Sequence, residues 1–322
     1  MSTVTVATWN LENLFRPADG DSAPSVAVYD AKLAALAAVI TDLAPDVLAV
    51  QEVGTPAALD DLADRLSGTW HTEVAAPDGR GIRVGVLSRL PVLEVEQLSD
   101  FPPVLAPVQV DDAGTTLNQM GRPALRVRVP WRTASGALSR RKVLDVDSVH
   151  LKSKLLSFPG GRFNPRDEDE RARYAVYALH RRAAEAAAVR TYLTRVLDDD
   201  SQRRRVVLAG DLNDEPTAAT TQILLGPPGS EIGTPGFGRA DAGDAQRLWN
   251  LESLIKAADR FSRVYRGRGE LIDHLLVSHT LVGRARTVVA GGPVPASITD
   301  NPTPRRDEPA SDHRPVMATF TN

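Results

Sequence analysis

Polar residues that can bind a metal ion or carry a proton stand where apolar runs of this chain end. They are Asn10 and Glu12 in Thr-Trp-Asn-Leu-Glu-Asn, Glu52 in Val-Gln-Glu-Val, His150 in Ser-Val-His-Leu, Asp211 and Asn213 in Gly-Asp-Leu-Asn, Asp273 in Leu-Ile-Asp-His, and Asp312 and His313 in Ser-Asp-His-Arg-Pro-Val. Carboxylate and amide oxygens suit a hard cation such as Mg²⁺. Carboxylate and imidazole groups can move the protons of phosphate-ester hydrolysis. Because burying so many charges is costly without a cation or substrate, we expect these side chains to share one site.

Each of these residues also has a structural interpretation when it is taken alone. Asp and Asn favour turns at strand ends, so Asp211 could form an Asx-turn, and Glu52 could cap a helix that begins near Pro56. The apolar run 47–50 instead indicates a buried strand that delivers Glu52 to the rim of a sheet, where it can bind a cation. Asp211 and Asn213 are two residues apart, which allows a carboxylate that accepts a proton from water beside an amide that holds a phosphoryl oxygen.

The histidines and the basic residues divide into site candidates and structural ones. Asp273 is expected to orient the imidazole of His313 and to raise its pKa by charge pairing, so that a doubly protonated ring stabilises phosphate oxygens. His274 is expected to face the other side of its strand and pack in the core. A basic segment follows His150, and it either binds phosphate or merely connects to the next helix. Its candidate substrate contacts are Lys152, Lys154 and Arg166.

Composition places the chain among ordinary globular proteins. Of its 322 residues, 42% are hydrophobic and 25% are charged. There is no cysteine, which excludes disulfides, thiolate metal sites and cysteine nucleophiles. The net charge of −3 and a pI of about 6.1 give no global attraction for a long nucleic acid, although a local basic groove remains an alternative. Asn10 and Asp312 can serve one site only if the two ends of the chain meet, so we predict a single domain over residues 1–322.

Targeting signals are not evident in the sequence. No stretch approaches the ~20 apolar residues that cross a bilayer. The first residues run into a strand-like segment without the basic start and apolar centre of a signal peptide. We therefore expect a cytoplasmic protein without a membrane span, and a monomer is favoured.

The element pattern predicts a mixed α and β protein with many short strands. Strands are expected at 4–9, 46–50, 70–74, 82–88, 92–97, 125–129, 142–149, 206–209, 271–278 and 315–320, and helices at 31–43, 59–66 and 168–197. Loops rich in Gly or Pro are expected at 226–243 and 290–309. This pattern is typical of two packed sheets covered by helices.

The order of the six motifs resembles the endonuclease/exonuclease/phosphatase superfamily, which includes deoxyribonuclease-like enzymes, abasic-site endonucleases, sphingomyelinases and inositol polyphosphate phosphatases. The resemblance spans about residues 4–320. It implies an α+β fold, a four-layer α/β/β/α sandwich of two mostly antiparallel mixed sheets flanked by helices, with a site at one rim that uses Mg²⁺ or Mn²⁺.

The resemblance also assigns expected roles. Glu52 would bind the metal with Asn10 and Glu12 close by, and Asp312 would serve the metal or the groups around it. Asp211 would activate water, and Asn213 would hold the nucleophile or the phosphate. Asp273 would pair with His313, and His150 would contact a phosphate oxygen.

The chain departs from the superfamily pattern in three ways. Glu12 stands where several branches carry Asp, which lengthens the reach of the carboxylate. No residue matches the glutamate that supports the first histidine in the deoxyribonuclease branch. The basic, aromatic surface of a dedicated abasic-site enzyme is not evident.

These observations favour a metal-dependent hydrolase that cleaves a phosphodiester by in-line attack of water, most simply a nuclease acting on DNA or RNA. The first alternative is a phosphomonoesterase (phosphatase) that acts on a small-molecule or lipid-derived phosphate. The second is a binding protein that keeps the fold without catalysis, and the complete motif set argues against it.

Overall fold

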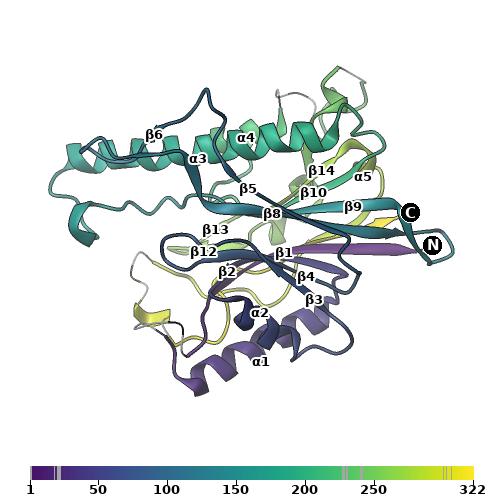
Figure 1. Ribbon diagram of the computed structural model, residues 1–322, viewed down its shortest axis with the longest axis horizontal. Coiled ribbons are helices and arrows are strands. Elements are labelled where there is room, and N and C mark those ends of the chain that lie inside the picture. The colour runs from purple at the N-terminus through teal and green to yellow at the C-terminus, as the bar shows by residue number, and fades with distance from the viewer. Residues whose placement is uncertain are drawn as a thin grey trace.

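A computed structural model describes the chain except residues 1, 18, 20–22, 227–228, 230, 240–241, 300, 302 and 306. Two six-stranded sheets pack face to face, and each is covered on its outer side by helices (Figure 1). The four layers are α1 with α2, the first sheet, the second sheet, and α3 with α4. The expected α+β, four-layer α/β/β/α sandwich is confirmed.

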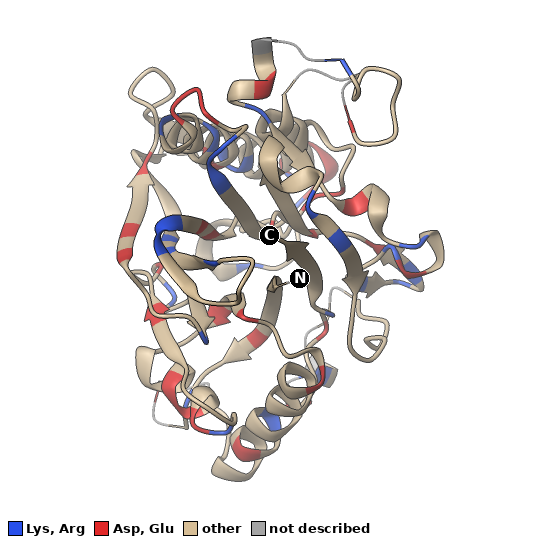
Figure 2. Ribbon diagram, turned by 90° about the vertical axis from the view of Figure 1, so that its right-hand side faces the viewer, with Lys and Arg blue, Asp and Glu red and all other residues tan. Residues whose placement is uncertain are grey.

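The first sheet joins the two ends of the chain. In sheet order its strands are β15 (Ala285–Ala290), β16 (Val316–Thr321), β1 (Thr3–Leu14), β2 (Val47–Val53), β4 (Arg83–Ser88) and β3 (His71–Val74). Strand β1 runs antiparallel to β16 and parallel to β2, and the remaining pairs are antiparallel. The termini therefore lie side by side at one end of the sheets, as Figures 1 and 2 show.

The second sheet has the same arrangement, with a single parallel pair. In sheet order its strands are β11 (Leu248–Asn250), β14 (Asp273–Ser278), β10 (Arg205–Asp211), β9 (Leu138–His150), β8 (Gln119–Arg132) and β5 (Glu94–Asp100). Only β9 and β10 are parallel. Because parallel strands end at the same rim, β1 with β2 and β9 with β10 deliver the ends of four strands to one side of the molecule.

Two small hairpins and short helical turns fill the connections. The hairpins are β6 (Val108–Gln109) with β7 (Thr116–Leu117), and β12 (Arg263–Tyr265) with β13 (Arg268–Glu270). The 3-10 turns are Pro159–Gly161, Ala242–Ala245, Glu252–Leu254, Ala257–Asp259 and Thr303–Arg305.

The helices begin and end at local signals. They are α1 (Val26–Leu43), α2 (Pro56–Ala63), α3 (Glu168–Leu197), α4 (Ala219–Leu225) and α5 (His279–Val282). Asp167 accepts the amide hydrogen of Glu170 at 2.7 Å and caps α3, whose first turn is acidic as the helix dipole favours. Helix α1 ends at Ala44, which has a left-handed φ of 46° and precedes a proline.

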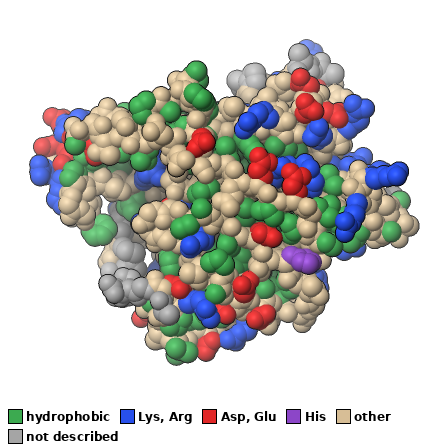
Figure 3. All heavy atoms as spheres, viewed as in Figure 1, with side chains coloured by type: hydrophobic (Ala, Val, Ile, Leu, Met, Phe, Trp, Pro, Cys, Tyr) green, Lys and Arg blue, Asp and Glu red, His purple; other side chains and the backbone are tan. Residues whose placement is uncertain are grey.

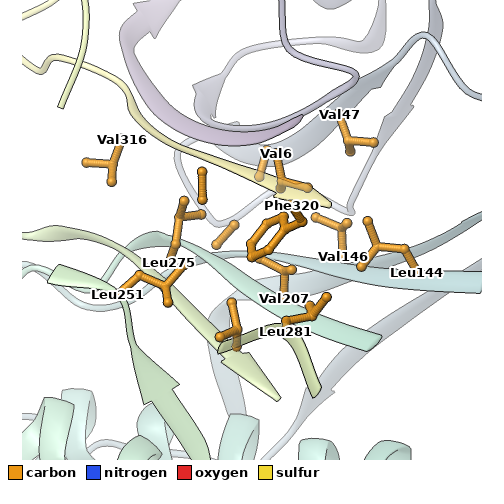
Figure 4. Close-up of a cluster of buried hydrophobic side chains, with 14 of the residues drawn as sticks. Val6, Val47, Leu144, Val146, Val207, Leu251, Leu275, Leu281, Val316 and Phe320 are labelled. Carbon is orange, nitrogen blue, oxygen red and sulfur yellow. The ribbon is translucent and has the colours of Figure 1, made fainter. Parts of the chain in front are cut away.

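The main core lies between the two sheets. Val6 and Val47 of the first sheet face Val146 and Val207 of the second, with Phe320 between them (Figure 4). Separate apolar clusters lie under α3 and under α1 with α2. Burial of these side chains is the main force that holds the layers together.

A buried polar contact also links the sheets just below the rim that carries the strand ends. The Gln51 side-chain amide donates to Ser148 Oγ at 3.3 Å and to Thr8 Oγ1 at 3.2 Å, and the Ser148 hydroxyl donates to the Val50 carbonyl at 3.2 Å. All three side chains are fully buried, so these hydrogen bonds fix the spacing of the two sheets close to the candidate site.

The long elements match the sequence expectation. The structure adds β15, β11 and the two hairpins, none of which the pattern predicted, and it extends the two strands expected at 125–129 and 142–149 into β8 and β9. The loop expected at 226–243 lies partly outside the described residues. Among the described residues, no helix is long and apolar enough to span a membrane.

Candidate active site

Asp211 is the last residue of β10 and lies at the centre of the rim. The sheet register pairs it with His150 on the parallel strand β9 and with Asp273 on the antiparallel strand β14. The preceding Gly210 allows this close approach, because a Cβ there would lie 2.1 Å from the Val149 carbonyl oxygen. Three chemically active side chains therefore stand in one row across the sheet.

The two carboxylate oxygens of Asp211 have separate partners. Oδ1 accepts the amide hydrogen of Asn213 at 2.8 Å, so the Asx-turn that was the structural alternative does form. Oδ2 accepts from Asn10 Nδ2 at 3.0 Å and lies 3.5 Å from His150 Nε2. Burial, and then the charge of Asp273, raise the pKa of Asp211 to about 7. Asp211 thus fixes a turn with Oδ1 and meets the other site residues with Oδ2.

His313 and Asp273 form a buried ion pair. His313 Nδ1 lies 2.6 Å from Asp273 Oδ2. Burial opposes the charge on the ring, but Asp273 and Asp312 outweigh it and raise the pKa of His313 to about 10. Burial likewise opposes ionisation of Asp273, yet the charge of His313 and hydrogen bonds from His313 and Ser262 hold the pKa of this carboxyl below its usual value. The ring is therefore an imidazolium at neutral pH, with Nε2 left for other partners.

His150 lies on the other side of Asp211 and has the opposite charge state. Its ring is buried, its Nδ1 has no hydrogen-bond partner among the residues that the structure describes, and Arg122 donates to its backbone carbonyl at 3.0 Å. Burial first, then the charges of Arg122 and His313, hold the pKa of His150 well below its usual value. This imidazole is neutral.

The first sheet contributes Asn10 and Glu52. Asn10 Nδ2 donates to Glu52 Oε1 at 3.2 Å as well as to Asp211, so one amide connects carboxylates from both sheets. Glu52 Oε2 accepts the amide hydrogen of Asn13 at 3.0 Å. The Oδ1 atom of Asn10 is engaged by the amide hydrogen of Glu12 at 2.9 Å.

Backbone strain is concentrated here. Eight described residues other than glycine have a positive φ, and four of them belong to this rim. They are Glu12 at 51°, Asn13 at 56°, Glu52 at 62° and Asn213 at 55°. Such conformations cost about 1–3 kcal/mol each and persist only where the surroundings enforce them, which is common at functional sites.

Glu12 and Asp312 lie together at the edge of the site. Arg305 donates to both oxygens of Glu12, at 2.8 and 2.7 Å, and the Asp312 amide donates to Glu12 Oε2 at 2.9 Å. The Asp312 side chain points toward His313, with 3.9 Å between Oδ1 and Nε2. Glu12 therefore has a guanidinium partner and orients the segment that carries Asp312.

A divalent cation fits this set of donors. Glu52, Asp211 and Asp312 offer carboxylate oxygens, and turning the Asn10 amide over would offer a fourth hard ligand. Asp211, Asp273 and His313 also each place a ligand atom within 4.8 Å of one another. In that group, however, His313 is an imidazolium paired with Asp273 and has no lone pair for a metal, so the oxygen-rich side near Glu52 fits a cation better.

Comparisons with known proteins identify this architecture. The sequence profile of the Endonuclease/Exonuclease/phosphatase family matches residues 7–313. The chain belongs to this family. It is accordingly a phosphoric ester hydrolase, from a family that generally depends on a divalent metal ion. No curated protein matches the chain by sequence.

Solved structures of the family share the fold. The human Nocturnin catalytic domain with bound sulfate anion has a TM-score of 0.56 at 14% identity, covering 99% of this chain and 94% of that one. An AP endonuclease from Archaeoglobus fulgidus has a TM-score of 0.53 at 17% identity, covering 99% and 100%. The mannosyl-6-phosphatase Bt3783 of Bacteroides thetaiotaomicron has a TM-score of 0.56 at 13% identity, again covering 99% and 100%. At these identities the likeness establishes the fold alone.

The basic candidates after His150 are less closely tied to the family site. Lys154 Nζ pairs with Asp214 at 3.2 Å. The Lys152 ammonium donates to the carbonyls of Ser153 at 2.9 Å and Leu155 at 2.6 Å. Arg166 is exposed, and no interaction found in the described part of the chain joins its side chain to the site.

Three supporting residues escaped sequence reasoning. Arg122 lies near the start of strand β8. Ser311 accepts the His313 amide hydrogen at 3.0 Å and donates to the Asn10 carbonyl at 2.7 Å. Arg305 lies in the segment 290–309, for which the sequence predicted only a loop. A serine directly before the Asp-His pair was a visible signal for Ser311. The two arginines had none, because their contacts are made across more than 25 residues of sequence.

Proposed function

We propose that this chain is a Mg²⁺- or Mn²⁺-dependent phosphodiesterase, in the first place a nuclease, that hydrolyses its substrate by in-line attack of water on phosphorus. The observation that carries the proposal is the convergence on Asp211. Its Oδ2 lies between a neutral imidazole, a charged imidazolium and the Asn10 amide that reaches the other sheet.

Asp211 acts as the proton acceptor in this proposal. A pKa of about 7 lets the carboxylate accept a proton from water near neutral pH, and turning the Asn10 amide over toward the cation would release Oδ2 from its hydrogen bond. Asn213 donates its Nδ2 to the Leu151 carbonyl at 3.0 Å, which leaves its amide oxygen to orient the attacking water.

The two histidines act on the phosphoryl oxygens. His313 carries a positive charge that Asp273 maintains, and its Nε2 can donate to an oxygen whose negative charge grows in the transition state. His150 is neutral, and its Nε2 can donate a hydrogen bond without adding charge. Both rings are buried, so their orientation is fixed before substrate binds.

Glu52, Asn10 and Asp312 hold the cation in this proposal, and Glu12 supports them from its pair with Arg305. When bound, the cation supplies Lewis-acid stabilisation of a phosphoryl oxygen.

Lys152, Lys154 and Arg166 remain proposed substrate contacts. The whole of residues 1–322 is treated as one domain, since β1 and β16 jointly carry one half of the site. A monomer remains part of the proposal, because one chain supplies every proposed role. A cytoplasmic location also remains part of the proposal.

Hydrolysis of a small phosphomonoester is the second candidate. Lys and Arg side chains alternate with Asp and Glu over the face drawn in Figure 3, and no region of a single sign covers that face. The net charge of −3 likewise gives no global attraction for a long nucleic acid, which favours a compact phosphate. Comparing bis(p-nitrophenyl) phosphate, p-nitrophenyl phosphate and nicking of a plasmid separates the two candidates.

Asp211→Asn tests the proposed role directly, with the exposed Asp42→Asn as a matched change of charge. We expect Asp211→Asn to lower kcat by roughly 10²–10⁴-fold with the fold intact, as expected for loss of a general base. Asp42→Asn should keep full activity. Chelation should abolish hydrolysis, and Mg²⁺ or Mn²⁺ should restore it. Near wild-type turnover in Asp211→Asn would exclude this role.

A further inference from the structure

A cavity of about 880 Å³ lies beside the rim, on the side of β8. Its walls come from segments 78–80, 116–122 and 152–153 and from Asp100, Leu155, Ser157 and Arg181 of α3. The volume is that of a site for a small molecule or one nucleotide. None of the residues assigned a role in hydrolysis lines it except Lys152.

Arg122 connects this cavity to the site. Its Nε donates to the His150 carbonyl and its Nη2 to the Leu151 carbonyl, both at 3.0 Å. The same guanidinium lines the cavity and lies 3.4 Å from Asp78. A group bound in the cavity would therefore lie against the strand end that carries His150, which itself contacts Asp211.

Positive charge predominates in the lining. Four cationic side chains face two acidic ones, Asp78 and Asp100. The Lys152 ammonium donates to the carbonyl oxygens of Ser153 and Leu155 and, at 3.4 Å, to the Ser153 hydroxyl, and no carboxylate among the described residues pairs with it. Burial, and then repulsion by Arg181, lower its pKa to about 7. An entering anion would relieve this repulsion.

Gly121 makes room for the Arg181 guanidinium. A Cβ on Gly121 would lie 1.7 Å from Arg181 Nη2, so any larger residue would displace that side chain. Arg181 is anchored through its Nε to Glu185 at 3.0 Å. Its Nη atoms make no hydrogen bond within the part of the chain that the structure describes, and they face a cavity. The two Nη atoms of Arg181 can therefore donate a pair of hydrogen bonds to an oxyanion in the cavity.

We propose that this cavity binds a second phosphoryl group of the substrate, through Arg181, Arg122 and Lys152, next to the phosphate that is hydrolysed. The inference rests on the proposed phosphate-ester hydrolysis and adds a substrate class to it. The second phosphoryl group can be the terminal phosphate of a mononucleotide or the neighbouring phosphate of a strand.

Matched substrates isolate this contact. Thymidine 5′-(p-nitrophenyl phosphate), its 3′-phosphorylated form and the corresponding dinucleotide share one scissile bond. The second substrate adds a terminal phosphate, and the third adds a phosphodiester with a second nucleoside. Each is measured with the wild type, Arg181→Ala, Gly121→Ala and the control Arg195→Ala. Arg195 lies on the same helix, exposed, over the ring of Tyr192.

We expect the wild type to prefer a substrate with a second phosphoryl group by at least about tenfold in kcat/KM, the usual size of a charge-assisted contact. Arg181→Ala and Gly121→Ala should lose this preference and keep their rate on the simple substrate, and Arg195→Ala should keep both. A larger gain from the 3′-phosphate indicates a mononucleotide, and a larger gain from the dinucleotide indicates a strand. Absence of a preference in the wild type, or its persistence in both cavity variants, overturns the proposal.

A binding measurement separates failure of this proposal from failure of the proposed function. If no substrate is hydrolysed, the proposed function fails. Calorimetric titration of the full chain with inorganic phosphate still tests the cavity. Loss of one class of sites in Arg181→Ala, and not in Arg195→Ala, supports the second phosphate site, and identical titrations of all three proteins overturn it.

Discussion

His313 and His150 lie on either side of the Asp211 carboxylate, yet their environments make His313 positively charged and His150 neutral. Both rings are buried, and burial alone would make both neutral. His313 gains its charge because Asp273 lies 2.6 Å away, with Asp312 beside it. In the described part of the chain no carboxylate pairs with His150 Nδ1, and Arg122 donates to the backbone carbonyl of His150. The His313 side of the site thus carries a positive charge, and the His150 side offers only a neutral hydrogen-bond donor.

The difference shows how one residue type can serve two functions at one phosphate. A permanent positive charge stabilises the transition state more than the ground state, whereas a neutral donor mainly fixes orientation. Losses of activity should therefore be unequal, and this inequality can be measured.

The largest effect is expected on the charged side. His313→Asn should lower kcat by roughly 10²–10³-fold, the usual cost of removing a donor to a developing oxyanion. Asp273→Asn should give a similar loss, because the ring loses the partner that keeps it charged. Steady-state kinetics on a p-nitrophenyl diester provide the measurement, and circular dichroism checks the fold.

The neutral side should be less sensitive. His150→Asn keeps a donor in a similar place, so kcat should fall by no more than about tenfold, the value of one neutral hydrogen bond. Equal losses for His150→Asn and His313→Asn would remove the distinction between the two sides.

The next substitution keeps both histidines and alters the proposed cation site beside Glu12 and Asp312. Arg305→Ala releases Glu12, which holds the Asp312 segment. The Mg²⁺ concentration for half-maximal activity should rise by about tenfold, as for other partners of ligand-bearing groups, while the rate at saturating Mg²⁺ stays nearly constant. An unchanged metal requirement would show that Glu12 does not support the cation site.

The smallest effect concerns a buried acid away from the site. Burial, and then the charge of Asp145, raise the pKa of Asp147 well above its usual 3.8, and no described residue forms a hydrogen bond with its Oδ2. The folded state binds this proton more tightly than the unfolded chain does, so stability falls as pH rises from about 3.8 through the folded pKa. Asp147→Asn should therefore be more stable at neutral pH by at least about 1 kcal/mol, which is close to one pKa unit.

Urea unfolding from pH 4 to pH 8 measures this difference. It should vanish near pH 4 and grow toward pH 8. A constant difference, or destabilisation at pH 8, would mean that Asp147 is satisfied by its surroundings. The stability difference at pH 8 measures the free-energy cost of burying a charged carboxylate that lacks an ion-pair partner among the described residues. His313, by contrast, has such a partner in Asp273.

Sequence reasoning reached the fold because periodicity and strand-end residues are local signals. Helix α3 begins and ends at residues 168 and 197 as expected, since its apolar spacing and its Asp167 cap are both local. The nine motif residues also lie at one rim, because two parallel strand pairs end there.

What the sequence could not provide is the pairing of distant groups. Glu12 seemed from its motif a neighbour of the metal, but Arg305, 293 residues away, engages both of its oxygens. The cavity proposed to bind a second phosphoryl group likewise depends on Gly121 and Arg181, which come together only when the chain folds. Short strands such as β11 and β12 have too few residues for a period to emerge.

Nitrogen-15 NMR of the two imidazoles tests the central contrast most directly. At pH 8, with and without Mg²⁺, His313 should show both ring nitrogens protonated, because its pKa is raised to about 10, while His150 should be a neutral tautomer. If both rings instead titrate together near the ordinary value of 6.5, the charged and neutral sides of Asp211 do not exist, and the account of the site is wrong.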